Sequence, residues 1–176
     1  MDISTKRTKL RDRLSGYWRM EVGNAVIIPL AVLFVAKMSE SPLGLLTWLS
    51  FLPMCALLLL GGLYWRGKLR SLDGDARPLD TSLAIADKSQ LALGFASVLA
   101  LLAALCAWVW PWLSVSLGDR IAATICSLLA VLEYVNYYHR QLQHFDHAAD
   151  FRRLIAGQGF RRAQMAGDLA RLRSRS

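Results

Sequence analysis

The chain has 176 residues, is 55% hydrophobic, has a mean hydropathy of +0.33 and carries a formal net charge of +8. A soluble domain of this length is rarely so apolar, so the composition argues against a water-soluble globular protein. All three cysteines (Cys55, Cys106 and Cys126) lie in apolar stretches, with no Cys-x-x-Cys motif, which indicates buried thiols and no disulfide framework.

Four nearly uncharged segments predict membrane-spanning helices at about residues 20–38, 42–65, 90–113 and 119–140. A helix needs about 20 mostly apolar residues to cross a hydrocarbon core of ~30 Å, and the last three segments have this length. The first is shorter, so Tyr17–Trp18 and Lys37 are expected at its two interfaces. A cleaved signal peptide is disfavoured there, because the residues after Lys37 offer no small-residue cleavage site. Residues 1–16 then form a basic cytoplasmic segment, and residues 17–142 form the membrane domain.

Local signals predict where the middle helices begin. Ser41-Pro42 is typical of an N-cap followed by a proline at the first helical position, which predicts the start of the second span. In the middle loop Asp73-Gly74 predicts a turn, and Asp80 or Thr81 is expected to cap a short interfacial helix before the third span.

The C-terminal part is the only sizeable region outside the predicted membrane domain. Leu142, Phe145 and Ala149 recur at helical spacing, which predicts that the fourth helix continues past the membrane. Residues 143–176 are expected to form a basic amphipathic cytoplasmic tail, interrupted at residues 157–159.

The distribution of Lys and Arg predicts the orientation. Six precede Glu21, five lie from Arg66 to Lys88 and eight follow His139, whereas the two remaining connections hold one each. The positive-inside rule therefore puts both termini and the middle loop in the cytoplasm. The aromatic residues agree with this orientation. Three tryptophans lie at the predicted outer end of the third span, where aromatic belts form. A Tyr-Trp-Arg tripeptide occurs at residues 17–19 and again at 64–66, and both copies are expected at the inner interface.

Glu133 is the main candidate for a functional residue, because it lies inside an apolar span. A charged side chain at the centre of a membrane helix costs about 2.5–3.5 kcal/mol, so it must be neutralised, paired or hydrated. Helical spacing puts Asn136 and Tyr137 on the same face. A predicted intramembrane polar layer comprises Glu133, Asn136, Tyr137, Asn24 and Ser97, with Gly61, Gly62 and Gly94 at the same depth. This layer is either a structural polar clamp or an ion, proton or substrate site.

Two groups in the tail have weaker chemical signals. His144, His147 and Asp150 follow one another at i,i+3 and are weak metal candidates, but no Glu-x-x-His or His-Glu-x-x-His motif accompanies them, so no metal or cofactor is expected. The arginines of the tail lie next to a span and among apolar residues, which favours contact with anionic lipid at the cytoplasmic face or with a protein partner. These arginines are Arg152, Arg153, Arg161, Arg162, Arg171 and Arg173. Nucleic acid is disfavoured, because base-stacking aromatics do not accompany them.

The sequence therefore predicts an all-α integral membrane protein: a four-helix transmembrane bundle with an extended cytoplasmic C-terminal helix. The favoured function is that of an accessory protein that packs against or recruits a partner in a membrane assembly. The alternative is a small oligomeric transporter or channel-like protein with its polar layer around Glu133. An enzyme is disfavoured, because no nucleophile with a base and no glycine-rich phosphate loop is present. The bacterial inner membrane is the expected location, from short loops and the lack of targeting or lipidation motifs.

Overall fold

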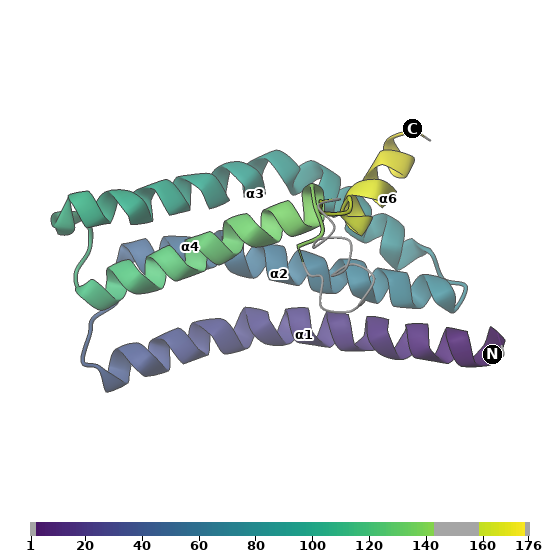
Figure 1. Ribbon diagram of the computed structural model, residues 1–176, viewed down its shortest axis with the longest axis horizontal. Helices are drawn as coiled ribbons and strands as arrows, with labels where there is room; N and C mark the ends of the chain where they lie inside the picture. The colour runs from purple at the N-terminus through teal and green to yellow at the C-terminus, as the bar shows by residue number, and fades with distance from the viewer. Residues whose placement is uncertain (1–2, 143–158, 175–176) are drawn as a thin grey trace.

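Four long helices dominate the computed structural model, which describes residues 3–142 and 159–174. They are α1 (Ile3–Met38), α2 (Leu45–Leu72), α3 (Arg77–Val109) and α4 (Leu117–Tyr138), followed by the shorter α6 (Gln164–Arg173). A 3₁₀ turn, η1 (Pro111–Leu113), lies between α3 and α4. The chain reverses direction between each pair of consecutive long helices (Figure 1). All four are long and apolar enough to cross a membrane, so the predicted all-α four-helix transmembrane architecture is confirmed.

The outer surface of the bundle is apolar. Large hydrophobic side chains on α1 and α3 are exposed along much of each helix, among them Ile27, Leu30, Phe34, Leu91 and Phe95. A water-soluble monomer rarely exposes apolar surface on this scale. Exposure of these side chains is what a lipid-facing surface requires, so the chain is an integral membrane protein.

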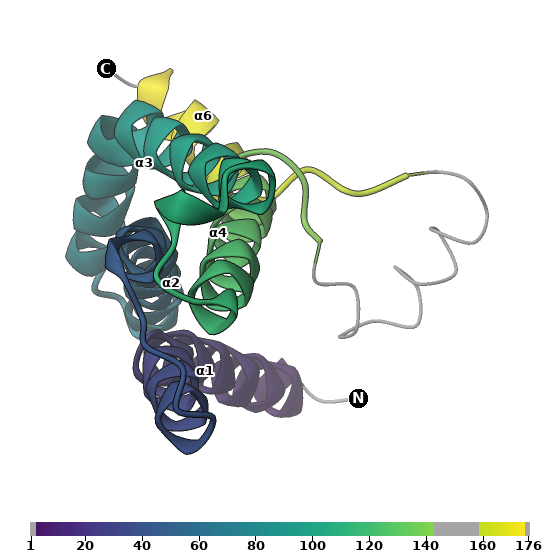
Figure 2. The ribbon, with the colours of Figure 1, turned by 90° about the vertical axis from the view of Figure 1, so that its left-hand side faces the viewer.

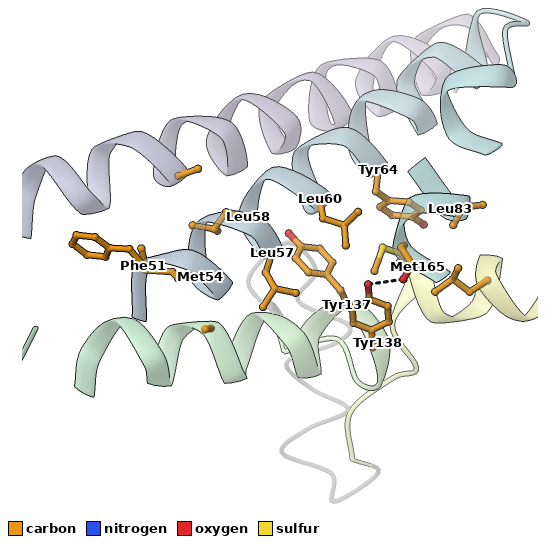
Figure 3. Packing of buried hydrophobic residues seen from close by; sticks show 14 of the residues in the cluster. Phe51, Met54, Leu57, Leu58, Leu60, Tyr64, Leu83, Tyr137, Tyr138 and Met165 are labelled. Atoms are coloured by element: carbon orange, nitrogen blue, oxygen red, sulfur yellow. Dashed lines mark hydrogen bonds between the residues drawn. The ribbon is translucent and has the colours of Figure 1, made fainter. Parts of the chain in front are cut away.

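Helix α2 is the centre of the bundle. It packs against α1, α3 and α4, whereas α1 packs mainly against α2. Seen end-on, α1 lies on the opposite side of α2 from α3 (Figure 2). The main core follows one face of α2 at helical spacing, through Met54, Leu57 and Tyr64, where α4 and α6 meet it (Figure 3). In the other half, α3 and α4 meet through buried alanines such as Ala104 and Ala123, whose small side chains allow close helix approach.

The two ends of the bundle differ in composition. We call one the basic end: it holds the N-terminal half of α1, the turn between α2 and α3, and α6 (Figure 1). The opposite end holds the α1–α2 and α3–α4 turns, residues 39–44 and 110–116. The N-terminus and α6 thus lie at the same end, as an even number of spans requires.

Three predicted helix boundaries differ from the structure. Helix α2 begins after an N-cap at Gly44 instead of at Ser41-Pro42, because a side chain of α4 supplies the capping acceptor there. Helix α3 is continuous from Arg77, with Pro78 in its first turn, so neither Asp80 nor Thr81 caps a separate interfacial helix. A proline in the first turn is sufficient to start the helix, since its fixed φ suits that position.

The third difference is at the end of α4. The sequence pattern predicts that this helix continues through Leu142, but it ends at Tyr138. The Asn136 Oδ1 atom accepts a hydrogen bond from the Leu142 backbone N–H at 2.9 Å, and Arg140 N–H bonds back to Val135 O at 2.8 Å. These bonds turn the chain out of the helix. Phe145 and Ala149 lie outside the described residues.

Candidate functional site

Two carboxylates from different helices meet around one tyrosine. Glu21 of α1 is 1% exposed, and its carboxylate lies beside the hydroxyl of Tyr137 on α4. The Trp65 side chain of α2 also approaches this hydroxyl, and Glu133, one turn before Tyr137, interacts with it electrostatically. We call Glu21, Trp65, Glu133, Asn136 and Tyr137 the polar cluster.

Two consecutive glycines of α2 make room for the polar cluster. A Cβ atom on Gly61 would collide with the Tyr137 ring and hydroxyl, and one on Gly62 would collide with the Val22 side chain beside Glu21. Gly61 therefore admits α4 to one side of α2, and Gly62 admits α1 to the other. Small residues have this role in membrane helix packing, because they let backbones approach closely.

Glu133 is only partly enclosed by its own chain. Its side chain is half-buried, and its Oε2 atom accepts a hydrogen bond from Asn136 Nδ2 at 3.3 Å. The Oδ1 atom of the Asn136 amide accepts a hydrogen bond from the Leu142 backbone N–H at 2.9 Å. The predicted grouping of Glu133, Asn136 and Tyr137 on one face of α4 therefore exists, and the end of α4 holds the amide in place.

The rest of the predicted layer is not part of this cluster. Asn24 is half-buried and forms no hydrogen bond with the part of the chain that the structure describes. Ser97 is buried but donates to Leu93 O of its own helix at 2.7 Å. Gly94 does lie against α4, where its Cβ would meet the ring of Tyr134.

Sequence reasoning missed Glu21, although a signal for it existed. Leu14, Glu21 and Ala25 are all buried, and their spacing of seven and four residues puts them on one helical stripe. Extending the apolar face of the first span backward from Ala25 would have placed Glu21 toward the helix interface instead of at a membrane boundary.

An apolar groove lies between α1 and α4, the helices that carry Glu21 and Glu133, but about two helical turns further from the basic end than Glu133. Its volume is about 380 Å³, and it lies between α1 and α4 toward the opposite end of the bundle. Small and branched side chains line it, including Ala31, Val35 and Ala36 from α1 and Gly118 and Ala122 from α4. The groove exists because α1 packs mainly on α2 and leaves its side toward α4 open.

A second buried carboxylate site lies at the opposite end. Asp119 is 0% exposed and accepts hydrogen bonds from Gly44 N at 2.9 Å, Thr47 Oγ1 at 2.6 Å and Val115 N at 3.2 Å. The Ser116 hydroxyl accepts from Asp119 N–H at 2.9 Å and so caps α4. Asp119 thereby supplies the capping acceptor at the start of α2, whereas Ser116 caps α4. The sequence signal was Ser116-x-x-Asp119 before an apolar run, the pattern of a capping box.

Helix α6 returns to the bundle and docks at the basic end. Asp168 accepts from Tyr64 Oη at 2.7 Å and pairs with Lys68 Nζ at 2.8 Å, while Met165 and Leu169 are buried beside Tyr64 (Figure 3). Arg173 pairs with Asp87 of α3 at 2.5 Å.

Several of the arginines predicted to contact lipid therefore form ion pairs or hydrogen bonds within the chain. Arg171 pairs with Asp168 at 3.6 Å, Arg173 with Asp87, and Arg162 donates to Ala166 O at 3.2 Å. Arg161 is exposed and also has a contact. Arg152 and Arg153 lie outside the described residues, as do the metal candidates His144, His147 and Asp150. Within residues 3–142 and 159–174, no group of His, Cys, Asp or Glu side chains could hold a metal ion.

The two Tyr-Trp-Arg tripeptides lie side by side on α1 and α2. The Tyr17 and Trp65 rings are 5.1 Å apart between centroids, and the Arg66 guanidinium lies 5.9 Å from the centroid of the Trp18 ring. Aromatic side chains with adjacent arginines are typical of a membrane interface. Comparison of the chain with protein-family models, with curated proteins and with solved structures finds no match.

Proposed function

We propose that this protein is a small accessory protein of a membrane assembly, which binds a transmembrane helix of a partner along the open side between α1 and α4. The observation that supports this is the half-buried Glu133 on α4, together with an apolar groove between α1 and α4 that ends at Ile125, about two helical turns away. An ionisable side chain at membrane depth requires a polar partner, and Asn136 supplies one hydrogen bond to it. A partner helix with a polar or basic residue at this level would complete the site.

The distribution of polar residues favours this role over conduction. The polar cluster lies in one part of the bundle, near the ends of α2 and α4. The carboxylate at the opposite end, Asp119, is fully buried and engaged in helix capping. A conducting path needs polar groups across the full membrane depth. In the single chain, the apolar groove between α1 and α4 interrupts any such path.

The charge asymmetry supports a location and an orientation for this role. We place the basic end, with both termini, in the cytoplasm, because short basic flanks are retained on that side. The bacterial inner membrane fits the short turns at the opposite end, which leave no extracytoplasmic domain between the described helices.

The test is to purify the tagged protein from native membranes in mild detergent, and to determine its mass and any stoichiometric companion. Glu133→Gln should reduce the retained partner about tenfold, the effect of losing a hydrogen bond to a charged group. Ala122→Leu, which fills the α1–α4 groove, should also reduce the amount of retained partner. Glu40→Gln at an exposed position and Ala96→Leu in a different groove are the matched controls.

Two results would contradict the accessory role. One is a stoichiometric partner whose retention is the same in all four variants. The other is a partner-free homo-oligomer whose reconstituted vesicles pass ions or protons in a Glu133-dependent manner. The second result would establish the alternative, a small oligomeric transporter or channel-like protein.

A further inference from the structure

A pocket of about 400 Å³ lies between α2 and α3 at the basic end, away from the α1–α4 side. Three arginines line it: Arg66 and Arg70 of α2, and Arg77 at the start of α3. Leu63 and Ile85 line it further along the two helices, away from the α2–α3 turn, and both side chains are exposed. The pocket is thus charged toward the turn and apolar toward the membrane.

Helix geometry produces this gradient. Leu63, Arg66 and Arg70 share one face of α2 at spacings of three and four residues. Arg77, Thr81 and Ile85 share one face of α3 at spacings of four residues, and α3 runs antiparallel to α2. The helices approach closely at the pocket because of Gly67, where a Cβ atom would collide with the Leu79 backbone.

The arginines of this pocket carry uncompensated charge. Elsewhere at the basic end Arg11 pairs with Asp73, Lys68 with Asp168 and Arg173 with Asp87. Arg66, Arg70 and Arg77 form no ion pair within residues 3–142 and 159–174, and no carboxylate is among the described residues that line the pocket.

The start of α3 adjoins the pocket. Its N-cap is Ala76, whose side chain cannot accept a hydrogen bond, and Asp80 is the acidic residue of its first turn. Arg66 also lies over the Trp18 ring of α1, 5.9 Å from the ring centroid.

We infer that this pocket binds the phosphate group of an anionic phospholipid, with an acyl chain along Leu63 and Ile85. Planar guanidinium groups bind phosphate oxygens through paired hydrogen bonds, and three arginines line this pocket. The apolar end of the pocket gives a lipid an advantage over a free phosphate ion, since only the lipid has a chain to place there. This inference is independent of the proposed function, which concerns the other side of α2.

The test uses the full chain purified in a neutral detergent and examined by native mass spectrometry with added lipid. Phosphatidylglycerol should be retained in preference to phosphatidylcholine. The Arg66→Gln/Arg70→Gln/Arg77→Gln variant should reduce this preference by about a hundredfold, since each arginine near a charged lipid contributes about fivefold. The control, Lys9→Gln/Arg19→Gln/Lys88→Gln, removes the same charge from exposed positions at the basic end and should keep the preference.

Because Arg66 also contacts Trp18, the Arg70→Gln/Arg77→Gln variant is measured too and should show a smaller loss in the same direction. Equal loss in the pocket and control variants would overturn the inference, since it would indicate non-specific attraction. Inorganic phosphate that binds with the same dependence on the arginines, while phosphatidylglycerol does not, would equally overturn the lipid as the ligand.

Discussion

Single residues decide how closely the helices of this bundle approach. Gly61 lies where the Tyr137 side chain of α4 crosses α2, and a Cβ atom there has no space. Gly16, in contrast, lies on α1 with nothing within 4 Å of an added Cβ. The two glycines therefore have opposite roles, although both are in helix interiors.

We expect Gly61→Ala to lower the free energy of unfolding by about 1–3 kcal/mol, the usual cost of overpacking. Gly16→Ala should raise it by about 0.5–1 kcal/mol, because alanine is the better helix former where space is free. Unfolding in mixed micelles with increasing SDS measures both changes. If both substitutions change the free energy of unfolding in the same direction, the result would contradict a close contact between Gly61 and Tyr137.

Asp119 is the residue with the most hydrogen-bonding roles at the opposite end. Removing its carboxylate leaves backbone N–H groups at the start of α2 without their acceptor in a buried place, while the Thr47 hydroxyl keeps only the Asp119 backbone oxygen, at 3.1 Å. We expect Asp119→Ala to destabilise the protein by about 3 kcal/mol in the same SDS titration. Asp75→Ala, at an exposed position of the α2–α3 turn, should change the free energy of unfolding by less than about 0.5 kcal/mol. Equal effects of the two substitutions would contradict the capping role.

At the scale of elements, the docking of α6 is the main feature that departs from a simple set of spans. Its apolar stripe, Met165 and Leu169, contacts the bundle, and Asp168 accepts hydrogen bonds from α2. Part of the predicted amphipathic tail thus packs against the protein's own transmembrane helices.

We expect Asp168→Ala to loosen this docking. Losing the Tyr64 hydrogen bond and the partly exposed Lys68 ion pair should increase the open population of α6 about fivefold. Trypsin cleavage after the arginines of α6, in detergent under conditions where opening is fast, should accelerate by the same factor. Gln164→Ala, an exposed change in the same helix, is the control and should leave the rate unchanged. An unaltered cleavage rate in Asp168→Ala would show that Asp168 does not hold α6.

At the scale of the whole molecule, the charge asymmetry predicts how the bundle lies in the membrane. Most of the Lys and Arg residues flank the basic end, while Lys37 and Arg120 are the two near the opposite end. Positive flanks are retained on the cytoplasmic side.

In a variant whose three native cysteines are replaced by alanine, we expect Glu40→Cys to react with a membrane-impermeant maleimide in intact cells. Asp75→Cys should react only after permeabilisation, because it lies in the turn at the basic end. The reverse pattern would invert the orientation, and labelling of both positions in intact cells would contradict the four-span topology.

The amino-acid sequence by itself determined the fold class of this protein and the number of helices long and apolar enough to cross a membrane. Long apolar runs must satisfy their backbone hydrogen bonds internally in lipid, so they form helices whatever surrounds them. The grouping of Glu133, Asn136 and Tyr137 was equally predictable, because residues three and four apart on one helix share a face.

Only the tertiary structure decided which residues from different helices meet. Glu21, and not Asn24, lies beside Tyr137, since the rotation of α1 against Gly62 depends on side-chain packing between helices. The start of α2 also depends on the fold, because a cap supplied from 75 residues away leaves no local pattern. The start of α3 follows instead from one proline, and the end of α4 from the Asn136 side chain. Helical periodicity specifies the faces of one helix, but the contacts between faces follow from shape and polar satisfaction over the whole bundle.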